Sequence, residues 1–188
     1  GHSVGGYGAV TTLKVIATIV GDVFGFHVQA MPKYGSEKKG LPTNTYLTVG
    51  AERIRAHNEL HDVDFVSLAN INAFNIGNPL AGLRDGGTLF VQTEQLDPEG
   101  LWADLPLSAR RIIRRRNIRV LGLDNQRIAQ EEAPTRDLVQ RMQGIVLLGV
   151  FLRGTPYREN LGVTDDLLWE KVTVALRRFF GPRRGEQV

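Results

Sequence analysis

The chain has 188 residues, no cysteine and a formal net charge of +3 at pH 7. This length suits one domain with a sizeable hydrophobic core. The absence of cysteine excludes disulfides, thiolate-bound zinc and iron–sulfur clusters held by this chain, and it is compatible with a cytoplasmic location. We see no signal peptide and no apolar run of the roughly 18 residues that cross a membrane.

A glycine-rich turn stands at the start of the chain. Gly5, Gly6, Tyr7 and Gly8 precede an apolar run that ends at Val20, and this run predicts a buried helix beginning near Gly8. Such a turn leaves backbone N–H groups free at the positive end of the helix dipole, which favours a phosphate-type anion. The spacing departs from G-x-G-x-x-G and no ribose-binding acid follows, which disfavours NAD or FAD. The alternative is that the glycines serve only the tight packing of a strand against the helix.

Very little sequence precedes this turn. We therefore expect a single domain over residues 1–188 with a truncated first strand. Either the chain is cut from a longer polypeptide, or Gly1 is left from cloning.

A long loop is predicted after the first helix. A short strand over residues 26–30 leads into residues 32–44, which are rich in turn residues and cations. Loops of this length are usually functional or disordered, and Tyr34 with Gly35 and Gly40 favours order. Strands are predicted next over residues 45–49 and 64–69.

Helices and strands alternate over the rest of the chain. The predicted elements are a helix starting at Asn78–Pro79, a strand over 88–92 after a turn at 85–87, an arginine-rich helix from Pro106, a strand over 118–123, a helix over 135–152 and a last helix from Thr164 to Gly181. This order predicts an α/β, three-layer, Rossmann-like domain with a mostly parallel sheet. Ligands of such sheets bind beyond the carboxyl ends of the strands, so we expect the glycine turn and the loop to face one pocket if their strands are neighbours.

Three other groups of residues each allow a functional and a structural interpretation. His57 and His61 are four residues apart, but the order H-N-E-L-H and the strand that follows disfavour a metal. Asparagines follow a predicted strand and either contact a ligand or only form turns: Asn70, Asn72, Asn75 and Asn78. Arginines gather in two predicted helices: Arg110, Arg111, Arg114, Arg115, Arg116, Arg119, Arg177, Arg178, Arg183 and Arg184. They form either solvated helix faces or a contact with a subunit or a cofactor phosphate. Nucleic-acid binding is disfavoured, because the chain lacks the interleaved aromatic residues of such modules.

Three sequence segments, taken together with their order and spacing, indicate a family. They read S-V-G-G-Y-G-A-V-T-T over 3–12, K-Y-G-S-E-K-K-G over 33–40 followed by P-T, and L-R-D-G-G-T-L over 83–89. Together they resemble the gamma subunit, or gamma domain, of the 2-oxoacid:acceptor (pyruvate/2-oxoacid:ferredoxin) oxidoreductases. That family has a G-G-Q-G turn opening the first helix and a later Y-G-x-E-x-R/K-G loop. Tyr7 stands where glutamine is usual, and Lys38-Lys39 where Arg-Gly is common.

The resemblance implies an enzyme subunit without its own active site. The family decarboxylates a 2-oxoacid to acyl-CoA and CO2. It uses thiamine diphosphate with Mg²⁺ and passes electrons through iron–sulfur clusters to ferredoxin or another acceptor. These cofactors lie on alpha, beta and delta-type subunits, and the gamma part packs near the entry of coenzyme A (CoA). The oxoacid, whether pyruvate, 2-oxoglutarate, branched-chain or aromatic, is selected on those other parts.

The anion site then acquires CoA as its candidate ligand. We expect the backbone N–H groups of Gly5, Gly6, Tyr7 and Gly8 to bind a CoA phosphate. Lys33, Lys38 and Lys39 are expected to add positive charge, and the Asn44 amide to complete this shared site. No residue is predicted to be catalytic. A stand-alone Rossmann-type nucleotide-binding oxidoreductase and a non-catalytic assembly module are the alternatives.

Overall fold

A computed structural model of the chain describes residues 1–4, 9–34, 42–55, 58–156, 159, 162 and 164–181. Six strands form one sheet in the order β2-β3-β1-β4-β5-β6. Their bounds are β1 His2–Val4, β2 His27–Tyr34, β3 Pro42–Gly50, β4 Val63–Leu68, β5 Leu83–Gln92 and β6 Arg119–Leu123. Strands β1, β4, β5 and β6 pair in parallel, and β3 pairs antiparallel with both β1 and β2. Among the described strands only β3 therefore opposes the others, and the sheet is mixed, which confirms an α/β fold.

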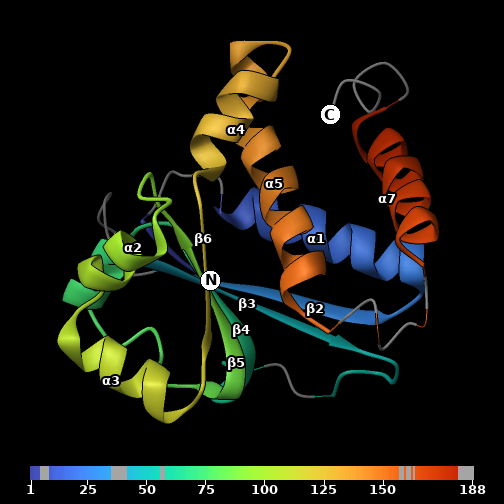
Figure 1. Ribbon diagram of the computed structural model, residues 1–188. Coiled ribbons are helices and arrows are strands. Elements are labelled where there is room, and N and C mark those ends of the chain that lie inside the picture. Colours follow the sequence, from blue (N-terminus) through green and yellow to red (C-terminus); the bar gives the residue numbers. More distant parts are fainter. Residues whose placement is uncertain are drawn as a thin grey trace.

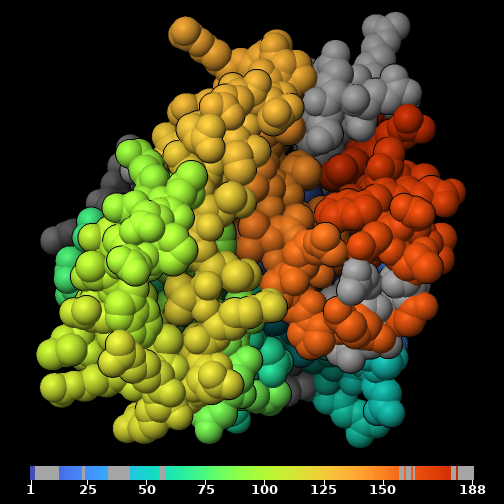
Figure 2. All heavy atoms as spheres, in the orientation of Figure 1, coloured from blue at the N-terminus to red at the C-terminus, as the bar shows by residue number. Residues whose placement is uncertain are grey.

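Helices lie on both sides of this sheet. They are α1 Ala9–Phe24, α2 Pro98–Asp104, α3 Leu107–Arg115, α4 Asn125–Glu132, α5 Val139–Gly154 and α7 Asp165–Phe180, with short 3₁₀ helices η1 Ile71–Asn75 and η2 Arg136–Leu138. Figure 1 shows α2 and α3 on one side and α1, α5 and α7 on the other. In the space-filling view of Figure 2, α2 and α3 cover one side of the visible face and α5 and α7 cover the other.

The first core lies between the sheet and helices α2 and α3. Strand residues two apart share a face, so β4 buries Val66 and Leu68 here while β5 buries Leu89 and Val91. Helix α3 contributes Ala109 and Ile113, which are four apart and therefore share one side of the helix.

The second core joins helices α1, α5 and α7. Ile19 and Val20 of α1 are fully buried, and they pack in one cluster with Leu148 of α5 and Leu168 of α7. Val28 of β2 and residues of β3 line the sheet side of this cluster. The predicted buried first helix is confirmed.

Helix α7 begins and ends as predicted. The Thr164 hydroxyl accepts the N–H of Leu167 at 3.4 Å, which satisfies one of the free donors of the first turn. Gly181 follows the helix with φ of 83°, a left-handed value that glycine adopts without strain.

The predicted loop over residues 32–44 is wrong at both ends. Strand β2 continues to Tyr34 and β3 begins at Pro42, so the two strands form a long antiparallel hairpin. Pro32 is tolerated because β2 is the edge strand, and Pro42 because it is the first residue of its strand. Residues 35–41 lie outside the described part of the chain.

The predicted helix at Asn78–Pro79 is also wrong. Asn78 does accept the N–H of Leu80, at 3.2 Å, as a helix cap would, but the chain only turns there and enters β5 at Leu83. The predicted turn over 85–87 lies inside β5, where Gly86 has φ of 74° and the pairing with β4 shifts register. Helices α2 and α4 were not predicted.

Within the described residues, no helix is both long and apolar enough to cross a membrane.

Candidate ligand-binding site

The two segments predicted to bind an anion leave the sheet at neighbouring points. Strand β1 ends at Val4, which pairs with Pro42 at the start of β3. Strand β2 ends at Tyr34, which pairs with Thr43. The residues that flank segment 5–8 therefore adjoin those that flank segment 35–41, at the edge that carries the carboxyl ends of β1, β2, β4, β5 and β6. Gly5, Gly6, Tyr7, Gly8, Lys38 and Lys39 themselves lie outside the described residues.

The structure brings the other two candidates, Lys33 and Asn44, together. They are cross-strand partners in the β2–β3 hairpin, so their side chains lie on the same face of the sheet. That face is opposite to the one formed by Leu47 and Val49, which packs toward helix α1.

Lys33 is not a free cation. Its ammonium lies 2.6 Å from a carboxylate oxygen of Glu59, and the two side chains are 52% and 42% exposed. The hydrogen bond and charge of Glu59 raise the pKa of Lys33, and the same contact lowers the pKa of Glu59. Both groups are therefore ionised at neutral pH, and their charges cancel unless a ligand separates them.

Tyr46 completes this polar group. Its hydroxyl donates to the other carboxylate oxygen of Glu59 at 3.4 Å. Burial, followed by the charge of Glu59, raises the pKa of Tyr46, so the phenol stays protonated at neutral pH. Glu59 thus holds one lysine and one phenol toward the turn end of the hairpin.

Asn44 is held from the other side by His2. The Asn44 side-chain oxygen lies 2.8 Å from Nδ1 of the His2 ring. Burial lowers the pKa of His2, while hydrogen bonds to Asn44 and to the backbone of Pro79 oppose the change. Asn44 is fixed in orientation by a half-buried, neutral imidazole.

The asparagines after β4 serve the chain itself. Asn70 accepts the N–H of Asn72 at 2.8 Å and caps η1, and Asn78 shapes the turn before β5. Turn chemistry therefore accounts for both residues.

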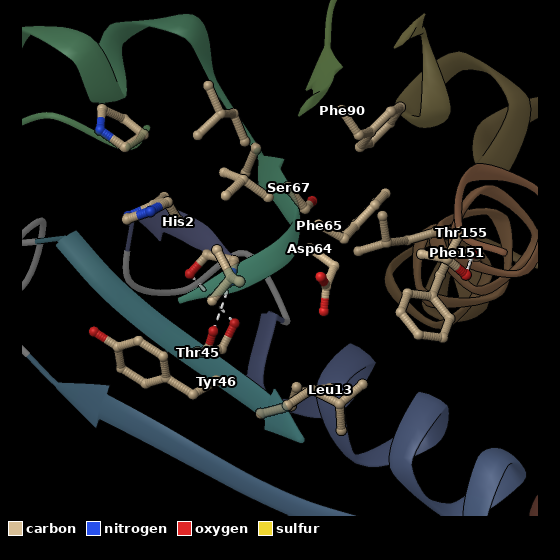
Figure 3. Close-up of a pocket in the computed structure, with 18 of the residues that line it drawn as sticks. His2, Leu13, Thr45, Tyr46, Asp64, Phe65, Ser67, Phe90, Phe151 and Thr155 are labelled. Carbon is tan, nitrogen blue, oxygen red and sulfur yellow. Dashed lines mark hydrogen bonds between the residues drawn. The ribbon is translucent and has the colours of Figure 1, made fainter. Parts of the chain in front are cut away.

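A cavity of about 1440 Å³ opens beside this polar group. It reaches from His2 and Ala69, at the carboxyl edge, to Thr155 beyond the end of α5. Figure 3 shows that residues of β3 and of β4 line its two sides.

The first arginine cluster lies at the opposite edge of the sheet. Arg116 donates to the Leu83 carbonyl at 2.8 Å, where β5 begins, and Arg114 stacks over Trp102 with 5.1 Å to the ring centroid. Arg116 thus contacts the chain itself at the amino end of β5, and a subunit or cofactor-phosphate contact of the cluster stays a prediction.

No group of three histidine, cysteine or acidic side chains that could hold a metal occurs in the described ranges. His61 is exposed, and His57 lies outside those ranges.

Sequence reasoning missed three members of the polar group: His2, Tyr46 and Glu59. Strand alternation could have found Tyr46, because it is two residues beyond Asn44 on one strand. Glu59 follows an irregular segment, and no local pattern places it near Lys33.

Comparison with known proteins gives one family. The pattern described as pyruvate ferredoxin/flavodoxin oxidoreductase matches residues 1–188. The common gamma subunit of the pyruvate/ketoisovalerate oxidoreductases of Thermococcus kodakarensis is 32% identical over 100 residues, which are 53% of this chain and 54% of that subunit. The match thus spans about half the length of this curated relative.

Solved structures share the fold. A pyruvate oxidoreductase subunit from Thermotoga maritima superposes with a TM-score of 0.60 at 22% identity, covering 94% of this chain and 90% of that one. The 2-oxoglutarate:ferredoxin oxidoreductase from Magnetococcus marinus, solved with 2-oxoglutarate, coenzyme A and succinyl-CoA bound, gives a TM-score of 0.57 at 16% identity. That match covers 95% of this chain and 26% of the other.

Proposed function

Because the chain belongs to the gamma branch of the pyruvate ferredoxin/flavodoxin oxidoreductase family, we propose that it is the gamma component of a 2-oxoacid:acceptor oxidoreductase. The assembled enzyme converts a 2-oxoacid and CoA to acyl-CoA and CO2 and delivers the electrons to ferredoxin or another acceptor. It works in the cytoplasm.

The redox and decarboxylation cofactors belong to alpha, beta and delta-type partners in this proposal. Thiamine diphosphate with Mg²⁺ supplies the decarboxylation chemistry, and iron–sulfur clusters carry the electrons. This chain has no cysteine and so offers no thiolate to a cluster. Its own contribution is structure and part of the CoA site, without a catalytic residue.

The CoA phosphates bind at the carboxyl edge of the sheet. The backbone of Gly5, Gly6, Tyr7 and Gly8 donates to one phosphate at the start of α1, as free N–H groups do at a helix N-terminus. Lys38 and Lys39 add charge from the segment that joins β2 to β3, and Lys33 and Asn44 add a cation and an amide from the strand ends that flank it. The observation that supports this assignment is the pairing of Val4 with Pro42, which brings together the strand ends that flank residues 5–8 and 35–41.

The chemistry of the described residues fits a phosphate. Lys33 is half-exposed and cationic, and Asn44 is oriented at the same end of the hairpin. The fold of the chain also matches part of a protein solved with CoA bound. A phosphate must compete with Glu59 for Lys33, so we expect Lys38 and Lys39 to contribute more to binding.

We assign the architecture to the three-layer Rossmann-like class. The support is the placement of α2 and α3 on one face of the sheet and of α1, α5 and α7 on the other, each over its own buried cluster.

The test is the CoA KM of the assembled enzyme. Charge-assisted contacts contribute about 1.5–3 kcal/mol each when shielded from water, so Lys38→Ala and Lys39→Ala should each raise the CoA KM about tenfold or more. The matched control is Lys171→Ala, which removes a lysine of α7 that stacks on Phe24, away from the carboxyl edge. Electron transfer measured without CoA should survive in all three variants. An unchanged CoA KM in both hairpin variants would overturn the site.

Two further measurements separate the alternatives. A stand-alone nucleotide-binding enzyme would be stabilised by NAD in a thermal-shift titration and would run alone in size-exclusion chromatography. An assembly module would co-purify with thiamine- and iron-bearing partners, yet its glycine and lysine variants would leave the CoA KM unchanged.

A further inference from the structure

The carboxyl edge of the sheet continues away from the hairpin to the ends of β5 and β6. In the order β2-β3-β1-β4-β5-β6 the chain first adds β2 and β3 on one side of β1, and then β4, β5 and β6 on the other side. The strand order therefore reverses between β1 and β4. Ligands of open α/β sheets bind outside the carboxyl ends at such a reversal, so a long ligand held at the start of α1 extends over the second half of the edge as well.

One side chain joins the ends of β5 and β6. Gln92 is the last residue of β5 and pairs with Leu123 of β6. Its Nε2 donates to the Asp124 carboxylate at 3.1 Å, and its Oε1 accepts the backbone N–H of Asn125 at 2.8 Å. The buried Asp124 carboxylate also accepts the N–H of Arg127 at 3.0 Å and so caps α4. This network fixes the backbone of Asn125 at the carboxyl edge.

Two amide side chains beside this network have no hydrogen-bond partner in the part of the chain that the structure describes. They belong to Asn125, the first residue of α4, and to Gln143, in the second turn of α5. Both residues are half-buried and line the large cavity. A primary amide offers two N–H donors and a carbonyl acceptor, so both side chains can pair with a ligand that enters the cavity.

The charges near these amides favour an uncharged ligand. The carboxylates of Glu94, directly after β5, and of Asp104, at the end of α2, also line the cavity. Among the described lining residues the one lysine or arginine is Arg84, which lies near the start of β5 and pairs with Asp64 at 2.9 Å. A phosphate at the β5–β6 end would therefore meet carboxylates without a cation to balance its charge.

Apolar side chains lie next to the amides. Phe90 is two residues before Gln92 on β5, and Leu147 is four residues after Gln143 on α5, so each apolar residue shares a face with an amide. Figure 3 shows Phe90 on one side of the cavity and Leu13 of α1 on another. The β5–β6 end of the cavity thus combines amide groups with hydrocarbon.

We propose that this end of the cavity binds the pantetheine arm of CoA through the side chains of Asn125 and Gln143. The inference rests on the proposed function, which places the CoA phosphates at the glycine turn and the hairpin. The pantetheine arm is uncharged, and its secondary amides are separated by short stretches of hydrocarbon, so it complements a lining of amides and apolar side chains. The arm then runs from the start of α1 past the ends of β4, β5 and β6.

Calorimetric titration of the assembled enzyme, without oxoacid, tests the arm site. Asn125→Ala and Gln143→Ala should each raise the Kd of CoA about two- to tenfold, as the loss of one neutral hydrogen bond does. The Kd of 4′-phosphopantetheine, which carries the arm, should rise by the same factor. The Kd of adenosine 3′,5′-diphosphate, which lacks the arm, should not change. The matched control is Gln130→Ala, an exposed amide of α4 that does not line the cavity.

Unchanged 4′-phosphopantetheine affinity in both variants would overturn the inference. A loss confined to adenosine 3′,5′-diphosphate would also overturn it, because the amides would then bind the nucleotide. Gln143→Glu keeps the size of the side chain and removes its donors, so it replaces Gln143→Ala if that variant does not fold or assemble. A wild-type enzyme that binds no CoA would reject the proposed function itself, whereas CoA binding that survives both amide substitutions rejects the arm site alone.

Discussion

Glu59 controls the charge at the turn end of the hairpin, because it neutralises the lysine proposed to bind CoA. The Lys33–Glu59 pair is half-exposed, and the carboxylate also accepts from Tyr46. A phosphate that approaches Lys33 must displace this carboxylate or share the ammonium with it.

Glu59→Gln should therefore tighten CoA binding. Freeing Lys33 lets the ammonium bind phosphate, and we expect the CoA KM of the assembled enzyme to fall about two- to fivefold, which is the scale of one exposed charge contact. The double variant Lys33→Ala, Glu59→Gln should lose this gain. A CoA KM that does not differ between Glu59→Gln and the wild type would remove Lys33 from the site.

The same pair predicts a pH dependence of stability. The pKa of Glu59 is lowered in the folded chain, so its contribution is present above the ordinary value of 4.5 and is lost as the pH falls through the lowered pKa. The pKa of Lys33 is raised, so its contribution is present below the ordinary 10.5 and is lost as the pH rises through the raised pKa. Urea unfolding should show a small advantage of the wild type over Glu59→Gln at pH 7. If that advantage persisted in strong acid, the ion pair would not be its source.

Gly82 is required by a close backbone approach. A Cβ at this position would lie 2.5 Å from the carbonyl oxygen of His61, whereas a Cβ at Gly77 would meet nothing within 4 Å. Gly82→Ala should therefore destabilise the chain by about 1–3 kcal/mol, as overpacking does. Gly77→Ala should change stability by less than about 1 kcal/mol. Denaturant midpoints measure both, and equal values would contradict the packing described for this turn.

At the scale of elements, helix α7 is held by one apolar face. Leu168 is 1% exposed and packs in the cluster with α1 and α5, while its neighbour Leu167 is 41% exposed. Leu168→Ala should cost about 2–5 kcal/mol through lost burial and a residual cavity. Leu167→Ala, the same change one position earlier, should cost less than about 1 kcal/mol. Comparable losses in chemical denaturation would mean that α7 docks through a different face.

Local chemistry predicted most long elements and failed where a signal was weak or the outcome depended on distant contacts. Helix α2 had a readable start, since the Asp97 carboxylate accepts the Gly100 N–H at 2.7 Å and Pro98 is the first helical residue. Asn78–Pro79 carries the same signal without a helix, because β5 begins only a few residues later. The ends of β2 and β3 that flank the hairpin turn were predicted as loop, because residues 32–44 are rich in turn residues and cations.

The candidate site was predictable in position but not in its internal contacts. The carboxyl edge and the neighbouring exits of two segments follow from topology. The partners of Lys33 and Asn44 do not, because Glu59 and His2 are brought there by an irregular segment and by strand order.

For the whole molecule, the two edges of the sheet have different surfaces. The carboxyl edge carries the hairpin, the polar group around Glu59 and the start of α1, while Arg116 and its neighbours lie at the amino edge. The proposed CoA site and Arg116 are therefore separated along the strands. A partner subunit bound at Arg116 would leave the proposed CoA site open.

The most direct test of the proposed CoA site is a CoA footprint on this chain in the assembled enzyme. Hydrogen exchange with and without saturating CoA should show slower exchange in residues 1–12 and 33–44, with no change across α7 as the internal control. Protection confined to other subunits, with these two segments unaffected, would contradict the account.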